Sequence, residues 1–86
     1  MGTVECFQVE GVRLWFPSLD HAPPHLHAKR DGEWECRIWF MEGSPRLEMK
    51  WSEKPMSAAH RRAIVGLAAG HRLELFAEWE RKVRTA

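Results

Sequence analysis

The sequence lacks the features that mark several common classes of protein. Among its 86 residues there is no tyrosine, and the only two cysteines, Cys6 and Cys36, do not form a CxxC pair. This pattern argues against a disulfide scaffold and is typical of buried thiols in a reducing cytoplasm. No apolar run approaches the ~20 residues that cross a bilayer, and the N-terminus lacks the basic start and apolar middle of a secretory signal. We therefore expect a cytoplasmic protein with no membrane partner.

The chain does contain enough apolar material for one small core. Hydrophobic residues make up 44 % of it, including five Trp and four Phe, and they are spread along its whole length. This distribution argues against disorder and predicts a single domain over residues 1–86. The net charge of +1 is unevenly divided, because residues 1–56 hold seven Lys/Arg against nine Asp/Glu and residues 57–86 hold six against three. The basic C-terminal part permits a nucleic-acid partner without requiring one.

Alternation of apolar and polar residues predicts an antiparallel β-meander of three to four strands. The clearest strand covers residues 33–41, and others are expected at residues 12–16, at residues 25–30 and around residues 47–51. A further short strand around residues 6–9 fits the pattern. Turn residues separate these segments, notably Gly11, Asp31-Gly32 and the stretch EGSP at residues 42–45.

After Pro55 the spacing of apolar residues changes to that of a helix. Ser57 is a suitable N-cap residue. Gly66 and Gly70 weaken the middle of the segment by roughly 1 kcal/mol each relative to alanine. We predict either two helices, at about residues 57–69 and 71–83, or one helix bent near Gly70. The fold class is therefore α+β, with a small antiparallel sheet packed against C-terminal helices. The predicted core consists of Trp34, Cys36, Ile38, Phe40, Leu47, Met49, Trp51, Ile64, Leu67, Leu75 and Trp79.

The segment DHAPPHLHA, residues 20–28, holds three of the five histidines. Residues two apart in a strand point the same way, so His25 and His27 share one face while Leu26 and Ala28 share the other. If the apolar residues face the helices, both histidines lie on the opposite face of the sheet. The same parity places further residues there: Arg13, Trp15, Glu35, Arg37, Trp39, Glu48 and Lys50. Two tryptophans among arginines and histidines exceed what solubility requires, so this face is the candidate site.

Three interpretations of the histidines remain open. His25 and His27 could ligate zinc with His21 or Asp20 as a third ligand, although the spacing is no known zinc signature, and we predict neither a metal nor another cofactor. In a metal-free ribonuclease, His25 and His27 would act as acid and base.

Arg37 and Arg13 would hold the phosphate in that ribonuclease, and Trp15 or Trp39 would stack on a base. In the structural interpretation, Asp20 and His21 only hydrogen-bond the loop. The candidate catalytic residues are thus His25, His27 and Arg37, and the candidate binding residues are Arg13, Trp15, Trp39 and His21.

Two motifs resemble a known bacterial family, domain of unknown function 4160. Its members carry a PPHxH segment, matched by Pro23, Pro24, His25 and His27, and a terminal HRxELxxxW helix, matched by His71, Arg72, Glu74, Leu75 and Trp79. The resemblance extends from about Val12 to Lys82. The chain departs from the family at Gly70, where an acidic or apolar helix former is usual.

The resemblance implies a small component of a bacterial two-gene operon, often beside a second small domain of unknown function (number 2442). Such pairs have been proposed as toxin–antitoxin-like modules, and the family has no established catalytic residues. We therefore expect an interaction protein of such a module whose partner is encoded by the neighbouring gene. The alternatives are a small metal-independent ribonuclease and a metal- or nucleic-acid-binding regulator, and the sequence leaves RNA and a second copy of the chain open as partners.

Overall fold

The computed structural model describes residues 2–17 and 23–84. Its strands are β1 (Gly2–Thr3), β2 (Arg13–Phe16), β3 (Leu26–Arg30), β4 (Trp34–Trp39) and β5 (Arg46–Ser52). They form one antiparallel sheet in the order β1-β2-β3-β4-β5. Helices α1 (Ala58–Gly70) and α2 (Arg72–Trp79) follow, and a π-helical turn, η1 (Glu80–Arg84), continues α2. The predicted α+β class is confirmed, but the sheet has five strands instead of three to four.

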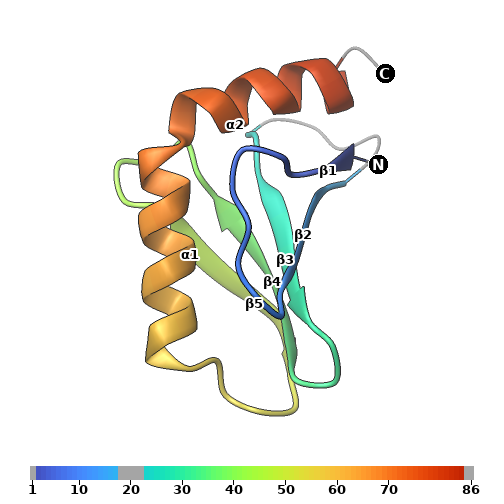
Figure 1. Cartoon of the computed structure of the whole chain (residues 1–86), viewed down its shortest axis with the longest axis vertical. Coiled ribbons are helices and arrows are strands. Elements are labelled where there is room, and N and C mark those ends of the chain that lie inside the picture. Colours follow the sequence, from blue (N-terminus) through green and yellow to red (C-terminus); the bar gives the residue numbers. More distant parts are fainter. Residues whose placement is uncertain (1, 18–22, 85–86) are drawn as a thin grey trace.

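The first strand is not where the sequence places it. No strand forms at residues 6–9 in the structure, where only an isolated bridge joins Val9 to Val12. The edge strand is β1, which pairs Gly2 with Phe16 and Thr3 with Trp15. We call residues 2–10 the N-terminal strap, because after β1 they leave the sheet and run toward the helices (Figure 1). The carboxylate of Glu78 accepts hydrogen bonds from the backbone N–H groups of Glu5 and Cys6, which draws the strap away from β2.

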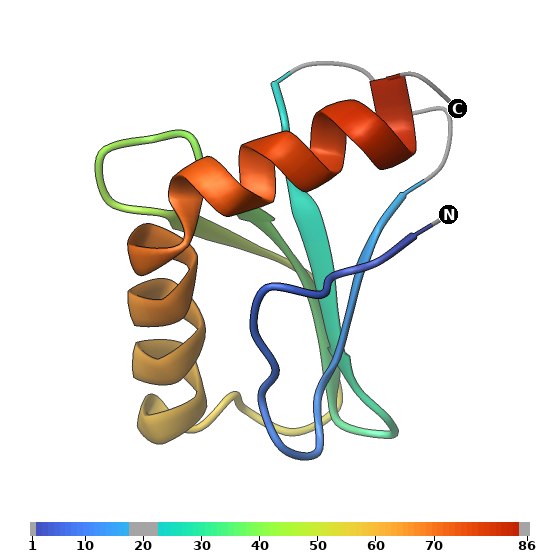
Figure 2. The same ribbon diagram turned by 45° about the horizontal axis from the view of Figure 1, so that its top comes forward.

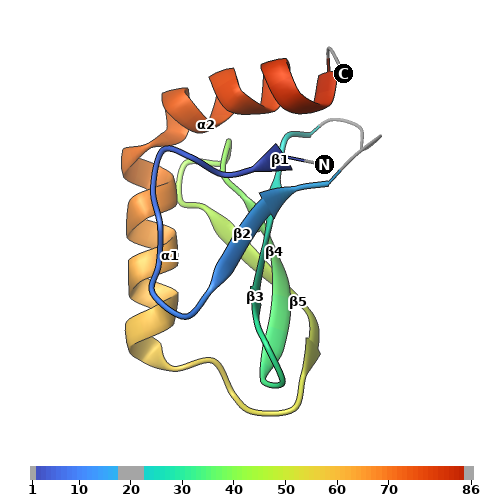
Figure 3. The same cartoon turned by 45° about the vertical axis from the view of Figure 1, so that its right-hand side comes forward.

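Both helices and the strap lie on the same side of the sheet, as Figures 2 and 3 show from two directions. This side holds the core, where Trp34, Cys36 and Ile38 of β4 are fully buried between the sheet and the helices. Phe16, Leu26, Ala28, Phe40, Ile64, Ala68, Leu75, Trp79 and Val83 complete it together with Val4, Phe7 and Leu14. Within residues 2–17 and 23–84, no helix lies on the opposite side of the sheet. Among the described residues, no helix combines the length and apolarity that a membrane crossing needs.

The predicted core is correct for the β4 residues and for Ile64, Leu75 and Trp79, but the predicted core residues of β5 and Leu67 of α1 are less buried than expected. Leu47 and Leu67 are only partly buried, and Met49 is 37 % exposed. A β-bulge opposite Glu35 and Cys36 inserts Lys50 as an extra residue, so that Cys36 pairs with Met49 but Glu35 pairs with Trp51. One extra residue reverses the side to which later side chains point. Trp51 therefore lies on the face opposite the core.

Of the two alternatives predicted for the C-terminal segment, the structure has two helices, α1 and α2. Ser57 caps α1 by accepting the backbone N–H of His60 at 3.0 Å. The chain turns sharply at His71, whose N–H donates to Leu67 O at 2.9 Å and whose C=O accepts from Leu75 at 2.8 Å. The single residue His71 thus ends one helix and begins the next. Among the described glycines only Gly11 and Gly32 have positive φ, so Gly70 does not turn the chain through a left-handed conformation.

Candidate functional site

We call the side of the sheet on which none of the described helices lies the open face. Its members are defined by cross-strand pairs such as Trp15–His27 and Arg37–Glu48, which share a side. The side chains of the open face are Arg13, Trp15, His25, His27, Lys29, Glu35, Arg37, Trp39, Arg46, Glu48, Lys50 and Trp51. The structure therefore brings together six of the seven sequence-predicted site residues. The seventh, His21, lies outside the described residues, as does Asp20.

Four rings form a continuous row across the middle of the open face. The ring centroids of Trp15 and His27 are 5.4 Å apart, those of His27 and His25 are 5.4 Å apart, and those of His25 and Trp39 are 4.3 Å apart. The row runs from β2 to β4 and steps along the β3 segment between His27 and His25. His25 is only 2 % exposed and His27 only 7 %. The sequence predicts their side of the sheet correctly, but the two histidines are packed between tryptophans and not solvated.

Glu35 lies beside the row, and its carboxylate is near polar groups of Trp51, Lys50 and His27. It accepts the indole N–H of Trp51 at 3.2 Å, and its Oε2 lies 3.3 Å from Lys50 Nζ and 3.6 Å from His27 Nδ1. Burial raises the pKa of Glu35, but the hydrogen bonds from Lys50 and Trp51 outweigh it, so that pKa lies below its ordinary value. Glu35 is therefore ionised at neutral pH.

Burial lowers the pKa of His27 below its ordinary value of 6.5, although the neighbouring Glu35 opposes this shift. We assign a neutral imidazole at pH 7, because the 3.6 Å separation from Glu35 is too long for a strong hydrogen bond. The Nε2 atom of His27 is shielded from solvent and has no hydrogen-bond partner among the described residues. A catalytic base has to reach the proton that it removes. The geometry of His27 therefore favours a packing role over proton transfer.

Ion pairs surround the row. Arg13 pairs with Asp31 at 2.8 Å, Arg37 with Glu48 at 3.3 Å, and Arg46 with Glu42 at 3.1 Å. Two cations also lie over tryptophan rings, with Arg46 5.3 Å from the centroid of Trp39 and Lys29 5.8 Å from that of Trp51. The open face thus has aromatic side chains at its centre and charged side chains around them.

Metal binding finds no complete ligand set in the part of the chain that the structure describes. Within residues 2–17 and 23–84, no three His, Cys, Asp or Glu side chains are grouped so that they could hold an ion. The third ligands considered from the sequence, His21 and Asp20, fall outside these ranges.

The second sequence motif, HRxELxxxW, has a structural role in this chain. His71 contacts Glu74 through Nδ1 at 2.9 Å and stacks on Phe7 of the strap. The guanidinium of Arg72 donates to the backbone carbonyls of the β4–β5 loop, at Phe40, Glu42 and Gly43. Leu75 and Trp79 lie in the core. These residues fix the helix corner against the strap and the loop.

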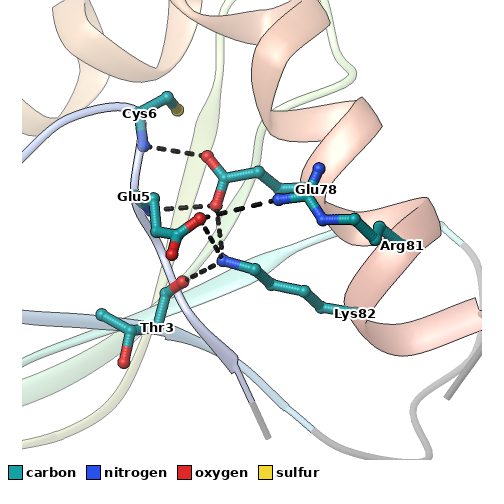
Figure 4. Close-up of polar contacts among 6 residues, drawn as sticks. All are labelled: Thr3, Glu5, Cys6, Glu78, Arg81 and Lys82. Carbon is teal, nitrogen blue, oxygen red and sulfur yellow. Dashed lines mark hydrogen bonds and ion pairs between the residues drawn. The ribbon is translucent and has the colours of Figure 1, made fainter.

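A second polar cluster, which sequence reasoning missed, holds the strap on α2 (Figure 4). Glu78 is 5 % exposed and accepts N–H bonds from Glu5 at 2.9 Å and from Cys6 at 2.8 Å. Lys82 Nζ lies 3.0 Å from the Glu78 carboxylate and donates to Thr3 O at 2.7 Å. In the sequence, Glu78 and Lys82 look like an ordinary exposed pair four residues apart on a helix, so no signal marked them as buried.

The cluster also sets the ionisation of its own groups. Burial raises the pKa of Glu78, but the hydrogen bonds from the Glu5 backbone and from Lys82 outweigh it and bring that pKa below its ordinary value. Burial, together with the adjacent Glu78 carboxylate, raises the pKa of the Cys6 thiol to about 12. Cys6 is therefore a protonated, unreactive thiol at neutral pH.

The geometry defines a small α+β protein whose meander sheet is covered on one side and carries an aromatic row on the other. The chain belongs to the family described as Domain of unknown function (DUF4160), whose model matches residues 11–80. That range includes both motifs and every member of the open face, but not the strap. No curated protein and no solved structure matches the chain.

Proposed function

We propose that this chain is an interaction protein of a bacterial toxin–antitoxin-like two-gene module and that its open face binds the protein encoded by the neighbouring gene. The two-gene part of the proposal rests on the family. The binding part rests on one observation, the row of Trp15, His27, His25 and Trp39 across a sheet face that no helix covers.

The anatomy of the open face is that of a protein–protein interface. Such interfaces have aromatic side chains and arginines at their centre and a polar rim, and tryptophan and arginine contribute most of the binding energy. Here Trp39 carries Arg46 over its ring, and ion pairs of Arg13 and Arg37 lie around the row.

RNA fits this face less well. Stacking on a base needs a free ring face, and Trp39 already contacts His25 and Arg46. Phosphate binding needs available cations, and Arg13, Arg37 and Lys50 are held in ion pairs. The buried Nε2 of His27 also argues against cleavage.

The test is to co-produce the chain with the product of the neighbouring gene and to measure complex formation. Trp39→Ala should weaken the complex by about 1–3 kcal/mol, or roughly 5- to 150-fold, because it removes a large aromatic side chain from the row. The matched control is Arg62→Ala, at an exposed position on α1, which should leave the complex unchanged.

RNA cleavage is measured on the same proteins and on His27→Ala. A complex that tolerates Trp39→Ala, or RNA cleavage that His27→Ala abolishes without loss of fold, would overturn the proposal. Induced expression with and without the neighbouring gene tests the module itself. Growth arrest that the neighbour relieves supports the two-gene part, whereas no effect in either case contradicts it.

A further inference from the structure

The open face holds more cations than carboxylates. Five cations (Arg13, Lys29, Arg37, Arg46 and Lys50) stand against two carboxylates (Glu35 and Glu48), a difference of +3 on a chain whose net charge is +1. If the turn residues Asp31 and Glu42, which pair with Arg13 and Arg46, are counted as well, five cations stand against four carboxylates. The excess charge of the face is therefore positive by either count.

The ion pairs of the open face engage its carboxylates but not all of its cations. Each carboxylate of the open face already contacts a cation, since Glu35 holds Lys50 and Glu48 holds Arg37. Lys29, in contrast, forms no ion pair with any described residue, and its Nζ lies 5.8 Å from the ring centroid of Trp51. A basic partner would find no unpaired carboxylate here, whereas an acidic partner would find a lysine without a carboxylate.

Two N–H donors on the open face also have no acceptor. Trp39 Nε1 and Arg37 Nε are shielded from solvent and have no hydrogen-bond partner among the described residues. The indole N–H groups of Trp34 and Trp79 are unpaired in the core as well, but Trp39 Nε1 and Arg37 Nε belong to the open face, where a partner can supply the acceptor that buried donors require. Arg46, which lies over Trp39, is exposed and can move to admit one. Carboxylate and carbonyl oxygens are the acceptors that a protein segment supplies.

At the β2 end the row runs into a recess. Because Glu78 draws the strap away from β2, a space of about 1060 Å³ remains between the strap and β2. Its lining includes the apolar side chains of Val9 and Val12, and it reaches Trp15 and Lys29 of the open face. A recess of this size admits at least one large side chain, and filled pockets of this kind anchor protein interfaces.

We infer that the partner presents an acidic segment that crosses the strands along the row and places an apolar side chain in the recess beside β2. This inference rests on the proposed function and names the chemistry of the partner. Carboxylates of the segment contact Lys29, and its acceptors reach Trp39 Nε1 and Arg37 Nε. The row spans two strand spacings, about 10 Å, so a segment of a few residues covers it.

The experiment uses three synthetic peptides and one RNA as probes. The first peptide alternates glutamate with leucine and ends in phenylalanine, the second has lysine in place of every glutamate, and the third ends in alanine. Oligouridylate is the RNA. Binding is followed by NMR through the indole N–H signals of the five tryptophans, which are assigned from single Trp→Phe variants.

The acidic peptide should shift the signals of Trp15, Trp39 and Trp51 and leave those of the buried Trp34 and Trp79 unchanged. Lys29→Glu should weaken its binding about tenfold, and Arg62→Glu, the matched charge reversal on α1, should have less than a twofold effect. The alanine-ended peptide should bind several-fold more weakly, because the recess then stays unfilled.

Equal or tighter binding of the lysine peptide, or an unchanged affinity in Lys29→Glu, overturns the inference. Failure of the inference is distinguishable from failure of the proposed function. If the neighbour's product binds the open face and Lys29→Glu leaves that complex intact, the function stands and the acidic chemistry is wrong. If oligouridylate shifts the signals of Trp15, Trp39 and Trp51 and the acidic peptide does not, the inference and the proposed function are both wrong.

Discussion

Replacing Glu78 tests whether the strap is held by one buried carboxylate. Glu78→Ala leaves the backbone N–H groups of Glu5 and Cys6 without their acceptor and removes a contact of Lys82. A hydrogen bond to a charged group contributes about 1.5–3 kcal/mol. Glu5 is exposed and water can reach part of the site. We therefore expect the free energy of unfolding to fall by about 3–5 kcal/mol, toward the lower end of the sum for the two hydrogen bonds. Glu78→Gln keeps one acceptor oxygen and should lose about 1–3 kcal/mol.

The assay is urea unfolding followed by tryptophan fluorescence. Glu74→Gln is the control, because the side chain of Glu74 is 61 % exposed and forms an ion pair with His71. The stability lost in this variant should stay below about 1 kcal/mol. Since the pKa of Glu78 is lower in the folded state, its contribution is present above its ordinary pKa of 4.5 and is lost as the pH falls through the folded value. This acid-side loss should be absent in Glu78→Gln.

A second readout comes from the thiol that the strap shields. Cys6 should react slowly with a thiol reagent at neutral pH, because burial raises its pKa to about 12, and Glu78→Gln should accelerate the reaction. Cys36, which is fully buried in the sheet, should not change. A loss below about 1 kcal/mol in Glu78→Ala, with Cys6 reactivity unaltered, would refute the view that Glu78 holds the strap.

Three further predictions concern the sheet. Trp34→Ala should lower the free energy of unfolding by about 3–5 kcal/mol, whereas Trp51→Ala should lower it clearly less because Trp51 lies on the open face. Equal losses in urea unfolding would contradict the register that the bulge sets. Since burial lowers the pKa of His27, folding favours its neutral form, so stability should fall as the pH drops below 6.5, and His27→Gln should flatten this part of the stability profile. Gly11→Ala and Gly32→Ala should each cost about 1–2 kcal/mol, because both glycines have positive φ and the added Cβ at Gly11 meets only the flexible end of the Arg30 side chain; unchanged melting temperatures would contradict the positive φ.

Much of the fold follows from the sequence because its signals are local. The alternation in residues 33–41 places Trp34, Cys36 and Ile38 in the core and leaves Arg37 and Trp39 on the other side. The same parity puts His25 and His27 on the face of Trp15, and the Ser57 cap marks the start of α1. These features depend only on neighbouring residues and on the two-residue repeat of a strand.

The features that sequence reasoning missed depend on contacts between distant residues. The bulge at Lys50 has no local sequence signal, so the two-residue repeat predicts a core position for Trp51, which the bulge reverses. The burial of His25 and His27 arises from rings on β2 and β4, which parity cannot show. The strap leaves the sheet because Glu78, more than seventy residues away, captures its N–H groups.

The link between the strap and α2 has a consequence for the order of events during synthesis. The bonds of Glu78 to Glu5 and Cys6 span 73 and 72 residues, and that of Lys82 to Thr3 spans 79. Contacts so distant in sequence form late, because closing the loop costs entropy before any contact is gained. On the ribosome the strap is made first but cannot dock until α2 has emerged, and until then Val4 and Phe7 have no helix to cover them. The first residues translated are therefore among the last to reach their folded positions.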